Sequence, residues 1–316
     1  MRYSKRSGLI ALAAGLTLTL AACGDDGGGG GDGDLAGTSF TVGSKEFTEQ
    51  LILGQMAILV LEDAGAEVED KTGLVGTETV RTALTSGEID MYWEYTGTGW
   101  TSHLGHDALE ATDDPQELFD DVAKEDLQKN QIEWFALAPF ENTYAIATTS
   151  ARAEELGTAT LSDYAEVANS DPSKASLCAA TEFLTRSDGW PGLEKEYGFD
   201  LPKDEIVEVD LGLVFDQVPD GEKCSFGEVF STDGRIPAND LTLLEDDKDF
   251  FVKFNLAMTS TQDALKQNPK LEDIFTPLAE ALTTETMQEL NAQVDEQGLP
   301  AEQVAEKWLE DNDFLG

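Results

Sequence analysis

Short apolar runs alternate with longer amphipathic segments along most of the chain. Strands are predicted at 40–42, 66–69, 91–95, 132–138, 143–148, 175–180, 206–209, 226–231 and 241–244. Helices are predicted at 48–64, within 76–90, at 115–129, 161–168, 193–197 and 213–218, and over most of 261–316. Strands that alternate with helices indicate an α/β fold with mostly parallel sheets. Two such blocks followed by a helical tail predict two lobes.

A polar run, Ser44 to Gln50, lies at the first predicted turn from strand to helix. In α/β folds ligands bind where loops leave the carboxyl ends of strands. The amides of the following helix N-terminus favour polar or anionic groups. We therefore expect this run to form one wall of a binding cleft.

The first 22 residues have the pattern of an export signal. Arg2, Lys5 and Arg6 precede an apolar stretch, residues 9–20, that is too short to span a bilayer as a stable helix. The stretch ends in Leu-Ala-Ala-Cys and resembles a bacterial lipoprotein signal, in which Cys23 would become the lipid-bearing N-terminus. The alternative is an ordinary signal peptide with a chance cysteine. Residues 23–37, rich in Gly and Asp, predict a flexible tether. We expect an extracytoplasmic protein, lipid-anchored to the cell membrane.

The chain is strongly acidic. Its 20 Lys+Arg and 63 Asp+Glu give a formal net charge of −43. A protein of this charge repels the phosphate backbone, so nucleic acid is excluded as a partner. The acidity keeps the protein soluble and disfavours anionic ligands at long range. Adaptation to a salty habitat explains the composition better than a direct functional role does.

Apart from Cys23, the chain has two cysteines, Cys178 and Cys224. An even pair in an oxidising compartment favours a disulfide, and two buried free thiols are the alternative. The disulfide would contribute roughly 3–4 kcal/mol in the chain-entropy model.

No set of catalytic residues stands out, and no cofactor is expected. His103 and His106 are three residues apart, but nothing nearby completes a metal site and Gly105 indicates a loop, so we expect surface histidines and no metal. The chain has no G-x-S-x-G, P-loop, H-E-x-x-H or Rossmann glycine pattern. These absences favour binding over catalysis.

Six segments in order resemble one family. They are VGSKEFTEQLILGQM (42–56), GEIDMYWEYTGTG (87–99), ENTYAIA (141–147), EFLTRSDGWPGLEKEYG (182–198), GEVFSTDGRI (227–236) and LLEDDKDFF (243–251). Together they resemble the substrate-binding lipoproteins of ABC importers for glycine betaine, choline and carnitine, which have a type II periplasmic-binding-protein fold. The resemblance implies two α/β lobes with the ligand between them, lobe one at 38–142 plus 237–316 and lobe two at 143–236. It also implies a monomer that delivers its ligand to a membrane permease driven by an ATPase.

The resemblance also implies which residues contact the ligand. A trimethylammonium group has no N–H to donate, so aromatic faces hold it by cation–π attraction. Trp93 and Trp190 are expected to be structural. The candidate ligand contacts are the aromatic residues Tyr95, Tyr144, Phe215 and Phe230 and the polar residues Gln50, Thr77, Asn142 and Thr232. For Gln50 the alternative is an exposed side chain on a helix that Ser44 or Thr48 caps.

Two positions depart from the family pattern. Glu141 stands where Asn is usual and would lie beside the site, and Phe230 replaces the usual Tyr. Arg186 and Arg235 could bind a carboxylate. The alternative is that they connect the lobes through ion pairs, in which Arg186 could pair with Asp188 or Asp233. The competing hypotheses are a binding protein for another solute such as an amino acid, an anchored exported enzyme, and an inert scaffold.

Overall fold

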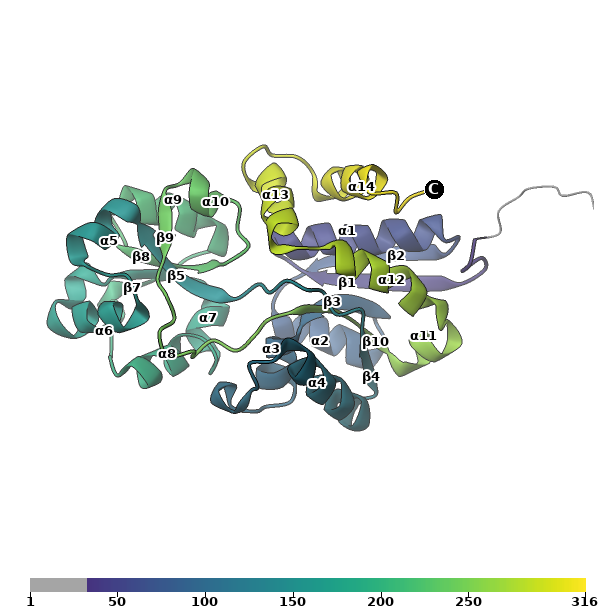
Figure 1. Cartoon of the computed structure of the whole chain (residues 1–316), viewed down its shortest axis with the longest axis horizontal. Coiled ribbons are helices and arrows are strands. Elements are labelled where there is room, and N and C mark those ends of the chain that lie inside the picture. Colours follow the sequence, from purple (N-terminus) through teal and green to yellow (C-terminus); the bar gives the residue numbers. More distant parts are fainter. Residues whose placement is uncertain (1–32) are drawn as a thin grey trace, which may run out of the picture. The chain divides into compact units, whose positions relative to one another are not determined.

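A computed structural model describes residues 33–316 (Figure 1). The predicted signal peptide (1–22), Cys23 and most of the predicted tether lie outside the described residues. Within the described part, no helix is long and apolar enough to cross a membrane.

The first of two five-stranded sheets is built from the two ends of the described chain. Its strand order is β2-β1-β3-β10-β4. The strands are β1 (Ser39–Lys45), β2 (Glu67–Leu74), β3 (Met91–Tyr95), β4 (Ile132–Phe135) and β10 (Leu256–Thr261). β1 pairs parallel with β2 and β3, whereas β10 is antiparallel to both β3 and β4.

The second sheet comes from the middle of the chain, in the order β7-β6-β8-β5-β9. Its strands are β5 (Tyr144–Thr149), β6 (Leu177–Ala179), β7 (Ile206–Glu208), β8 (Phe226–Phe230) and β9 (Leu241–Leu243). β6 pairs parallel with β7 and β8, and β5 is antiparallel to β8 and β9. The two-lobed α/β fold predicted from the sequence is confirmed, but each sheet is mixed rather than mostly parallel.

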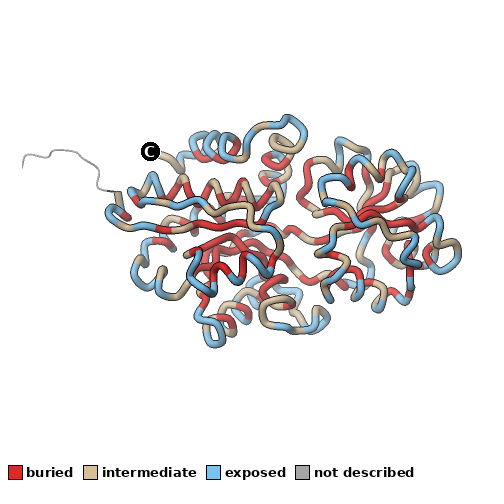
Figure 2. The backbone as a smooth tube through the Cα atoms, turned by 180° about the vertical axis from the view of Figure 1, so that it is seen from behind, coloured by how far each residue is buried: buried red, intermediate tan, exposed pale blue. Residues whose placement is uncertain are grey.

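Helices cover both sheets, and the strands between them carry the buried core (Figure 2). The helices are α1 (Thr48–Asp63), α2 (Thr77–Ser86), α3 (Thr96–Thr98), α4 (Pro115–Asn130), α5 (Ser150–Leu156), α6 (Leu161–Ser170), α7 (Thr181–Thr185), α8 (Trp190–Tyr197), α9 (Val214–Asp220), α10 (Arg235–Ala238), α11 (Gln262–Gln267), α12 (Lys270–Ala281), α13 (Thr284–Asp295) and α14 (Ala301–Asp311). A π-helical turn, Gly99–His103, follows α3.

The helix α1 positions the polar run predicted to line the site. It packs on β1 and β2 with one side and on α13 and α14 with the other. Apolar residues therefore occur around most of its circumference, and Ile52, Leu53, Met56 and Leu61 have no exposed surface. A helix that is apolar on all sides is one that is buried on all sides. This packing fixes the first turn of α1 at the carboxyl end of β1.

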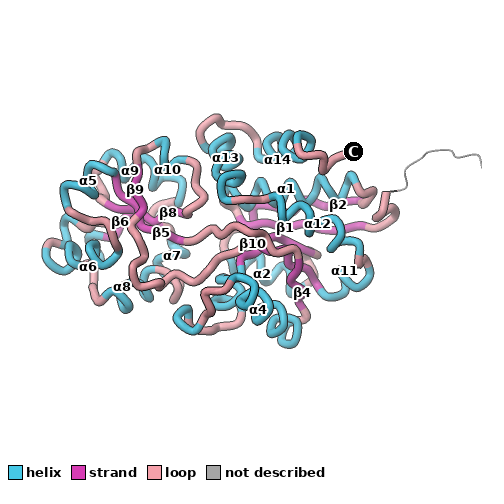
Figure 3. Tube along the Cα trace, viewed as in Figure 1, coloured by secondary structure: helices cyan, strands magenta, loops and turns pink. Residues whose placement is uncertain are grey.

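Two connections run between the sheets, residues 136–143 and residues 244–255 (Figure 3). They lie side by side, since Asn142 N–H donates to the Phe254 carbonyl and Glu141 forms a bridge with Asn255. The predicted return to lobe one at residue 237 falls ahead of β9, which hydrogen-bonds to β5 in the second sheet. We therefore place the return within 244–255, and the other predicted lobe bounds stay predictions.

Cys178, in β6, and Cys224, just ahead of β8, are joined by a disulfide with their Cα atoms 5.6 Å apart. Both are buried, and they pack with Val214, Phe215 and Val218 in a small cluster of the second lobe.

Candidate ligand-binding site

A cavity of about 770 Å³ is lined by residues from both lobes. From the first lobe come the loop after β1, the start of α2, the end of β3 and residues of α13. From the second come the segments after β6 and β7 and the end of β8. The lining therefore includes residues at the carboxyl ends of six strands of the two sheets, β1, β2, β3, β6, β7 and β8, where α/β folds place their ligands.

Five aromatic side chains line the cavity. Four of them form one apolar wall, which we call the aromatic cluster: Phe47, Tyr95, Tyr144 and Phe230. The fifth, Phe254, packs edge-on against Tyr144 with the ring centroids 5.7 Å apart. The ring centroid of Phe230 lies 5.1 Å from that of Phe47 and 5.1 Å from that of Tyr144. The ring centroids of Phe47 and Tyr95 are 6.4 Å apart. Tyr144 and Phe230 face each other because they are directly paired between β5 and β8. Rings from β1–α1, β3, β5 and β8 thus meet at one place.

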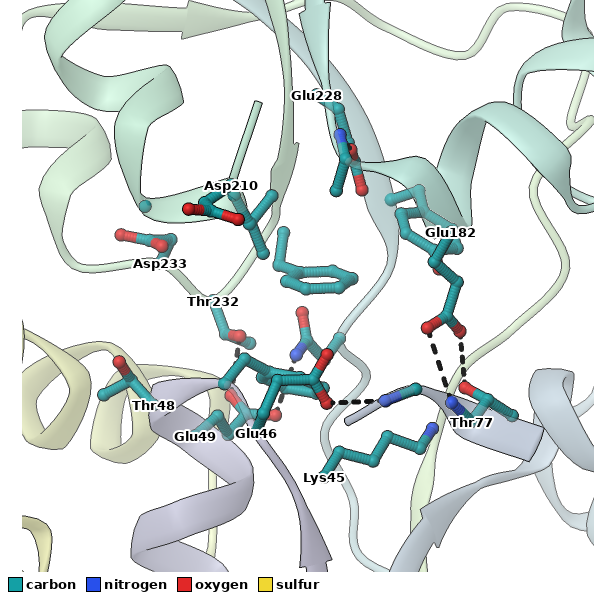
Figure 4. A pocket seen from close by; sticks show the side chains of 18 of the residues that line it. Lys45, Glu46, Thr48, Glu49, Thr77, Glu182, Asp210, Glu228, Thr232 and Asp233 are labelled. Atoms are coloured by element: carbon teal, nitrogen blue, oxygen red, sulfur yellow. Dashed lines mark hydrogen bonds between the residues drawn. The ribbon is translucent and has the colours of Figure 1, made fainter. Parts of the chain in front are cut away.

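Glu49, in the first turn of α1, is the most heavily hydrogen-bonded carboxylate of the cavity (Figure 4). It accepts from the Tyr95 hydroxyl at 2.7 Å, the Thr232 hydroxyl at 2.6 Å and the side-chain amides of Asn142 at 2.8 Å and Asn291 at 3.2 Å. Burial raises the pKa of Glu49 above its usual value, although these four donors oppose the effect. Because Thr232 follows β8 and Tyr95 ends β3, this one carboxylate connects both walls of the cavity.

A second buried carboxylate, Glu94, lies behind the cavity. It accepts from the Lys45 ammonium at 2.7 Å and contacts the His103 ring nitrogen at 3.1 Å. Burial acts to raise the pKa of Glu94, but Lys45 and His103 hold it well below its usual range. The expectation that His103 is a surface residue is wrong: its side chain, at the end of the π-helical turn, is fully buried against Glu94. Among residues 33–316, no group of His, Cys, Asp and Glu is placed to hold a metal ion.

The basic side chains of the lining are all engaged by carboxylates. Lys45 pairs with Glu94, and its Nζ lies 5.3 Å from the Tyr95 ring centroid. Arg186 forms ion pairs with Asp188 and, at 3.0 Å, with Glu182. Arg235 pairs with Asp233 at 2.7 Å and Asp295 at 3.5 Å. Of the two partners expected for Arg186, Asp188 pairs with it, whereas Asp233 pairs with Arg235.

Thr77 and Glu182 close one side of the cavity (Figure 4). The Thr77 hydroxyl, at the start of α2, donates to Glu182 of α7 across the two lobes. Glu182 also accepts a hydrogen bond from the Arg186 guanidinium at 3.0 Å. The hydrogen of the Thr77 hydroxyl is therefore already used in a bond within the protein.

Six of the eight predicted ligand contacts line the cavity: Thr77, Tyr95, Asn142, Tyr144, Phe230 and Thr232. Gln50 and Phe215 are not in the lining. Gln50 is fully buried beside the cavity wall, where its Oε1 accepts from the Lys45 amide at 3.4 Å. Phe215 packs in the small cluster around the disulfide. The central carbon of the Arg235 guanidinium lies over its ring, 4.0 Å from the ring centroid. Glu141 also lies outside the lining and pairs with Lys253.

Sequence reasoning missed Phe47 and Glu49, although both lie inside the polar run that it singled out. The signal for Phe47 was a lone aromatic residue within a polar loop, where no core requires it. The signal for Glu49 was its place in the first helical turn at a strand's carboxyl end, next to the residue chosen instead, Gln50. On a helix, adjacent residues differ in direction by about 100°, and here Glu49 lines the cavity whereas Gln50 is turned into the buried interior beside it.

Known proteins resemble this chain over nearly all of its described length. The family model for the substrate binding domain of ABC-type glycine betaine transport systems matches residues 38–311. The glycine-betaine-binding protein of Pseudomonas aeruginosa is 32% identical over 279 residues, 87% of this chain and 88% of that protein. The glycine betaine-binding protein YehZ of Escherichia coli is 31% identical, covering 87% of this chain and 90% of that protein.

Solved structures agree with these sequence matches. The apo structure of YehZ superposes with a TM-score of 0.64 at 30% identity, covering 87% of this chain and 99% of that one. A crystal structure of a glycine betaine/carnitine/choline ABC transporter superposes with a TM-score of 0.69 at 28% identity, covering 88% and 99%.

The family match extends through both sheets and the connections between them, so it includes every segment that lines the cavity. Proteins of this family bind a solute outside the cytoplasm for import and carry out no reaction on it. The chain belongs to the family of substrate binding domains of ABC-type glycine betaine transport systems, and is the solute-binding component of such an importer.

Proposed function

We propose that the cavity binds one small solute with a quaternary ammonium group, such as glycine betaine, choline or carnitine, and that the chain delivers it to the importer's permease. The observation that carries this proposal is the aromatic cluster on a cavity whose other walls are acidic. A methylated ammonium is attracted to ring faces by about 2 kcal/mol or more once water is excluded.

The charges of the lining support a cationic group. Three basic side chains line the cavity, and each is neutralised by carboxylates. The carboxyl side chains of the lining are Glu46, Glu49, Glu182, Asp210, Glu228, Asp233 and Asp295. Even without Glu49, Glu228 and Asp295, whose pKa values burial raises, four carboxylates remain against three cations, which gives an attractive potential for a positively charged group.

Within this proposal, Phe47, Tyr95, Tyr144 and Phe230 receive the methyl groups. Asn142 and Thr232 hold Glu49 in place, and through Glu49 they hold the Tyr95 ring. Thr77 is available to the solute only if its hydrogen bond to Glu182 opens. Gln50 and Phe215 have no contact role in the proposed complex, because neither lines the cavity.

The N-terminal segment and the oligomeric state complete the proposed function. We propose that lipid on Cys23 anchors the protein and that residues 23–37 tether the two lobes to the membrane surface. The protein would act as a monomer and meet an ATPase only through the permease. Mass spectrometry of the N-terminal peptide of the membrane fraction tests the anchor.

Titration calorimetry of the processed protein, without the predicted signal peptide, tests the ligand class. The panel is glycine betaine, choline, carnitine and a set of amino acids. We expect saturable binding of a quaternary amine, and an affinity loss of about 30-fold or more in Tyr144→Ala, since about 2 kcal/mol corresponds to that ratio.

The matched control is Tyr144→Phe, which keeps the ring and removes a hydroxyl for which the described residues provide no hydrogen-bond partner. It should retain the wild-type affinity. Unchanged affinity in a folded Tyr144→Ala protein would remove Tyr144 from the site. Binding of an amino acid alone would favour the competing solute class.

A further inference from the structure

One buried carboxyl group of the cavity has no cation of its own. Glu228, in β8, is 1% exposed and lines the cavity from the second lobe (Figure 4). Its Oε2 accepts one hydrogen bond, from the Ala180 amide at 2.7 Å. No basic group of the described residues forms an ion pair with it. Its other carboxyl oxygen is therefore free to meet a ligand.

Glu228 lies on the same strand as Phe230 of the aromatic cluster. It is two residues before Phe230 on the same strand, and alternate residues of a strand point to the same face. Both side chains line the cavity. Two residues of a strand span about 6.6 Å. A solute whose ammonium group lies against Phe230 and Tyr144 can therefore extend its polar end towards Glu228.

The groups that face Glu228 are few. From α7 and the residue that follows it come Glu182 and Arg186, from β5 comes Tyr144, and Asp210 follows β7 in the same lining. Arg186 is already bound by Glu182 and Asp188. Burial raises the pKa of Glu228 to about 8, with a further increase from Glu182, against the opposing effects of the Ala180 amide and Arg186.

We propose that Glu228 determines which quaternary ammonium solute the cavity accepts: as a neutral acid it donates a hydrogen bond to a ligand carboxylate, and as an anion it repels that carboxylate and favours a cationic alcohol. This inference rests on the proposed function above. The cavity then prefers glycine betaine under acidic and neutral conditions, and choline under alkaline conditions.

The two forms differ for a simple chemical reason. A protonated carboxyl has one O–H donor, whereas an ionised one can only accept. A betaine carboxylate can only accept as well, so it gains a partner in the first case and meets a like charge in the second. The choline hydroxyl can donate to the ionised form, and its net positive charge is attracted by it.

The experiment measures the affinities of the processed protein for glycine betaine and choline at about pH 6 and about pH 9.5, on either side of the Glu228 titration. Neither ligand changes its charge in this interval. We expect the ratio of betaine affinity to choline affinity to fall about tenfold or more as the pH rises, which corresponds to a shift of one unit in the pKa of Glu228 on binding.

Glu228→Gln keeps the side-chain shape and removes the titration. Its affinity ratio should be independent of pH. Glu222→Gln is the matched control, because Glu222 is exposed and lies outside the cavity lining, and its ratio should follow the wild type.

Proton uptake gives a second readout that a purely structural role would not change. Calorimetry near pH 8 in buffers of different ionisation enthalpy should detect protons taken up with glycine betaine in wild type and none in Glu228→Gln. A wild-type ratio that does not change with pH, or a pH dependence that persists in Glu228→Gln, would overturn the inference. Failure of both ligands to bind wild type at either pH would instead overturn the proposed function.

Discussion

Three buried glutamates of this protein differ in what surrounds their carboxyl groups. Glu94 has the Lys45 ammonium and the His103 ring, and its pKa is lowered despite burial. Glu49 has four neutral donors and Glu228 a single amide, and the pKa of each is raised. The four neutral hydrogen bonds of Glu49 therefore do not offset burial, whereas the Lys45 ammonium and the His103 ring together offset it at Glu94.

The raised pKa of Glu228 makes a prediction about stability. Between about pH 4.5 and pH 8 the folded protein keeps the Glu228 proton that the unfolded chain has released, so the free energy of unfolding falls as the pH rises through this interval. Glu228→Gln has no such proton. We expect its stability relative to wild type to increase with pH up to about 8 and then to level off, by a few kcal/mol in total.

Urea unfolding of both proteins across this range measures the difference. Taking the difference cancels the contribution of His103, whose pKa burial lowers, because that residue is present in both proteins. Glu222→Gln should show a flat difference. A flat difference for Glu228→Gln as well would mean that Glu228 is ionised in the folded state at neutral pH.

The site could be predicted from sequence only to the level of the segment. Tyr95 and Phe230 each end a strand and Tyr144 begins one, all inside family segments, and all three line the cavity. Phe215 lies in a predicted helix outside the six segments, and it packs beside the disulfide. The direction of a side chain depends on which strand neighbours it has, and pairing between strands far apart in sequence is not visible in a local pattern.

At the scale of elements, most strands and helices follow from periodicity, but β10 does not. Its residues 256–260 are all buried, since it lies between β3 and β4 and is covered on both faces. Such a strand has no alternation of polar and apolar positions, and it contains Thr259 and Ser260. Missing β10 concealed the antiparallel pairs of the first sheet, so the sheet was predicted to be mostly parallel.

The disulfide allows a prediction for the second lobe. It joins residues 46 apart, connecting β6 to the start of β8. Cys178→Ala with Cys224→Ala should lower the free energy of unfolding by roughly 3–4 kcal/mol, because the unfolded chain regains the entropy of that loop. Denaturant unfolding with and without reductant measures this loss.

Reductant provides the control for the disulfide. It should destabilise wild type by a similar amount and leave the double variant unchanged. If the double variant is as stable as the oxidised wild type, the disulfide does not stabilise the second lobe. If reductant also destabilises the double variant, the effect lies outside this pair.

At the scale of the whole molecule, several polar contacts cross between the lobes at the cavity. Thr232 donates to Glu49, Thr77 donates to Glu182, and Arg235 pairs with Asp295. All three involve residues of the lining, so the groups that surround a solute are also those that connect the lobes. Binding in the cavity and the arrangement of the lobes are therefore coupled through the same side chains.

The net charge of −43 leads to the last prediction. Repulsion among so many carboxylates opposes the compact state, and salt weakens it, since the screening length falls from about 10 Å at 0.1 M to about 3 Å at 1 M. Raising NaCl over this interval should increase the midpoint of thermal unfolding, with most of the gain complete by about 1 M.

The same titration at about pH 4.5, where carboxyl groups are partly protonated, separates charge screening from other effects of salt. The gain should shrink there, because fewer charges remain to be screened. An equal gain at both pH values would show that salt acts by strengthening apolar burial rather than by screening. A gain that disappears with acid would instead identify carboxylate repulsion as the force that limits stability at low salt, and would make this protein most stable in concentrated salt.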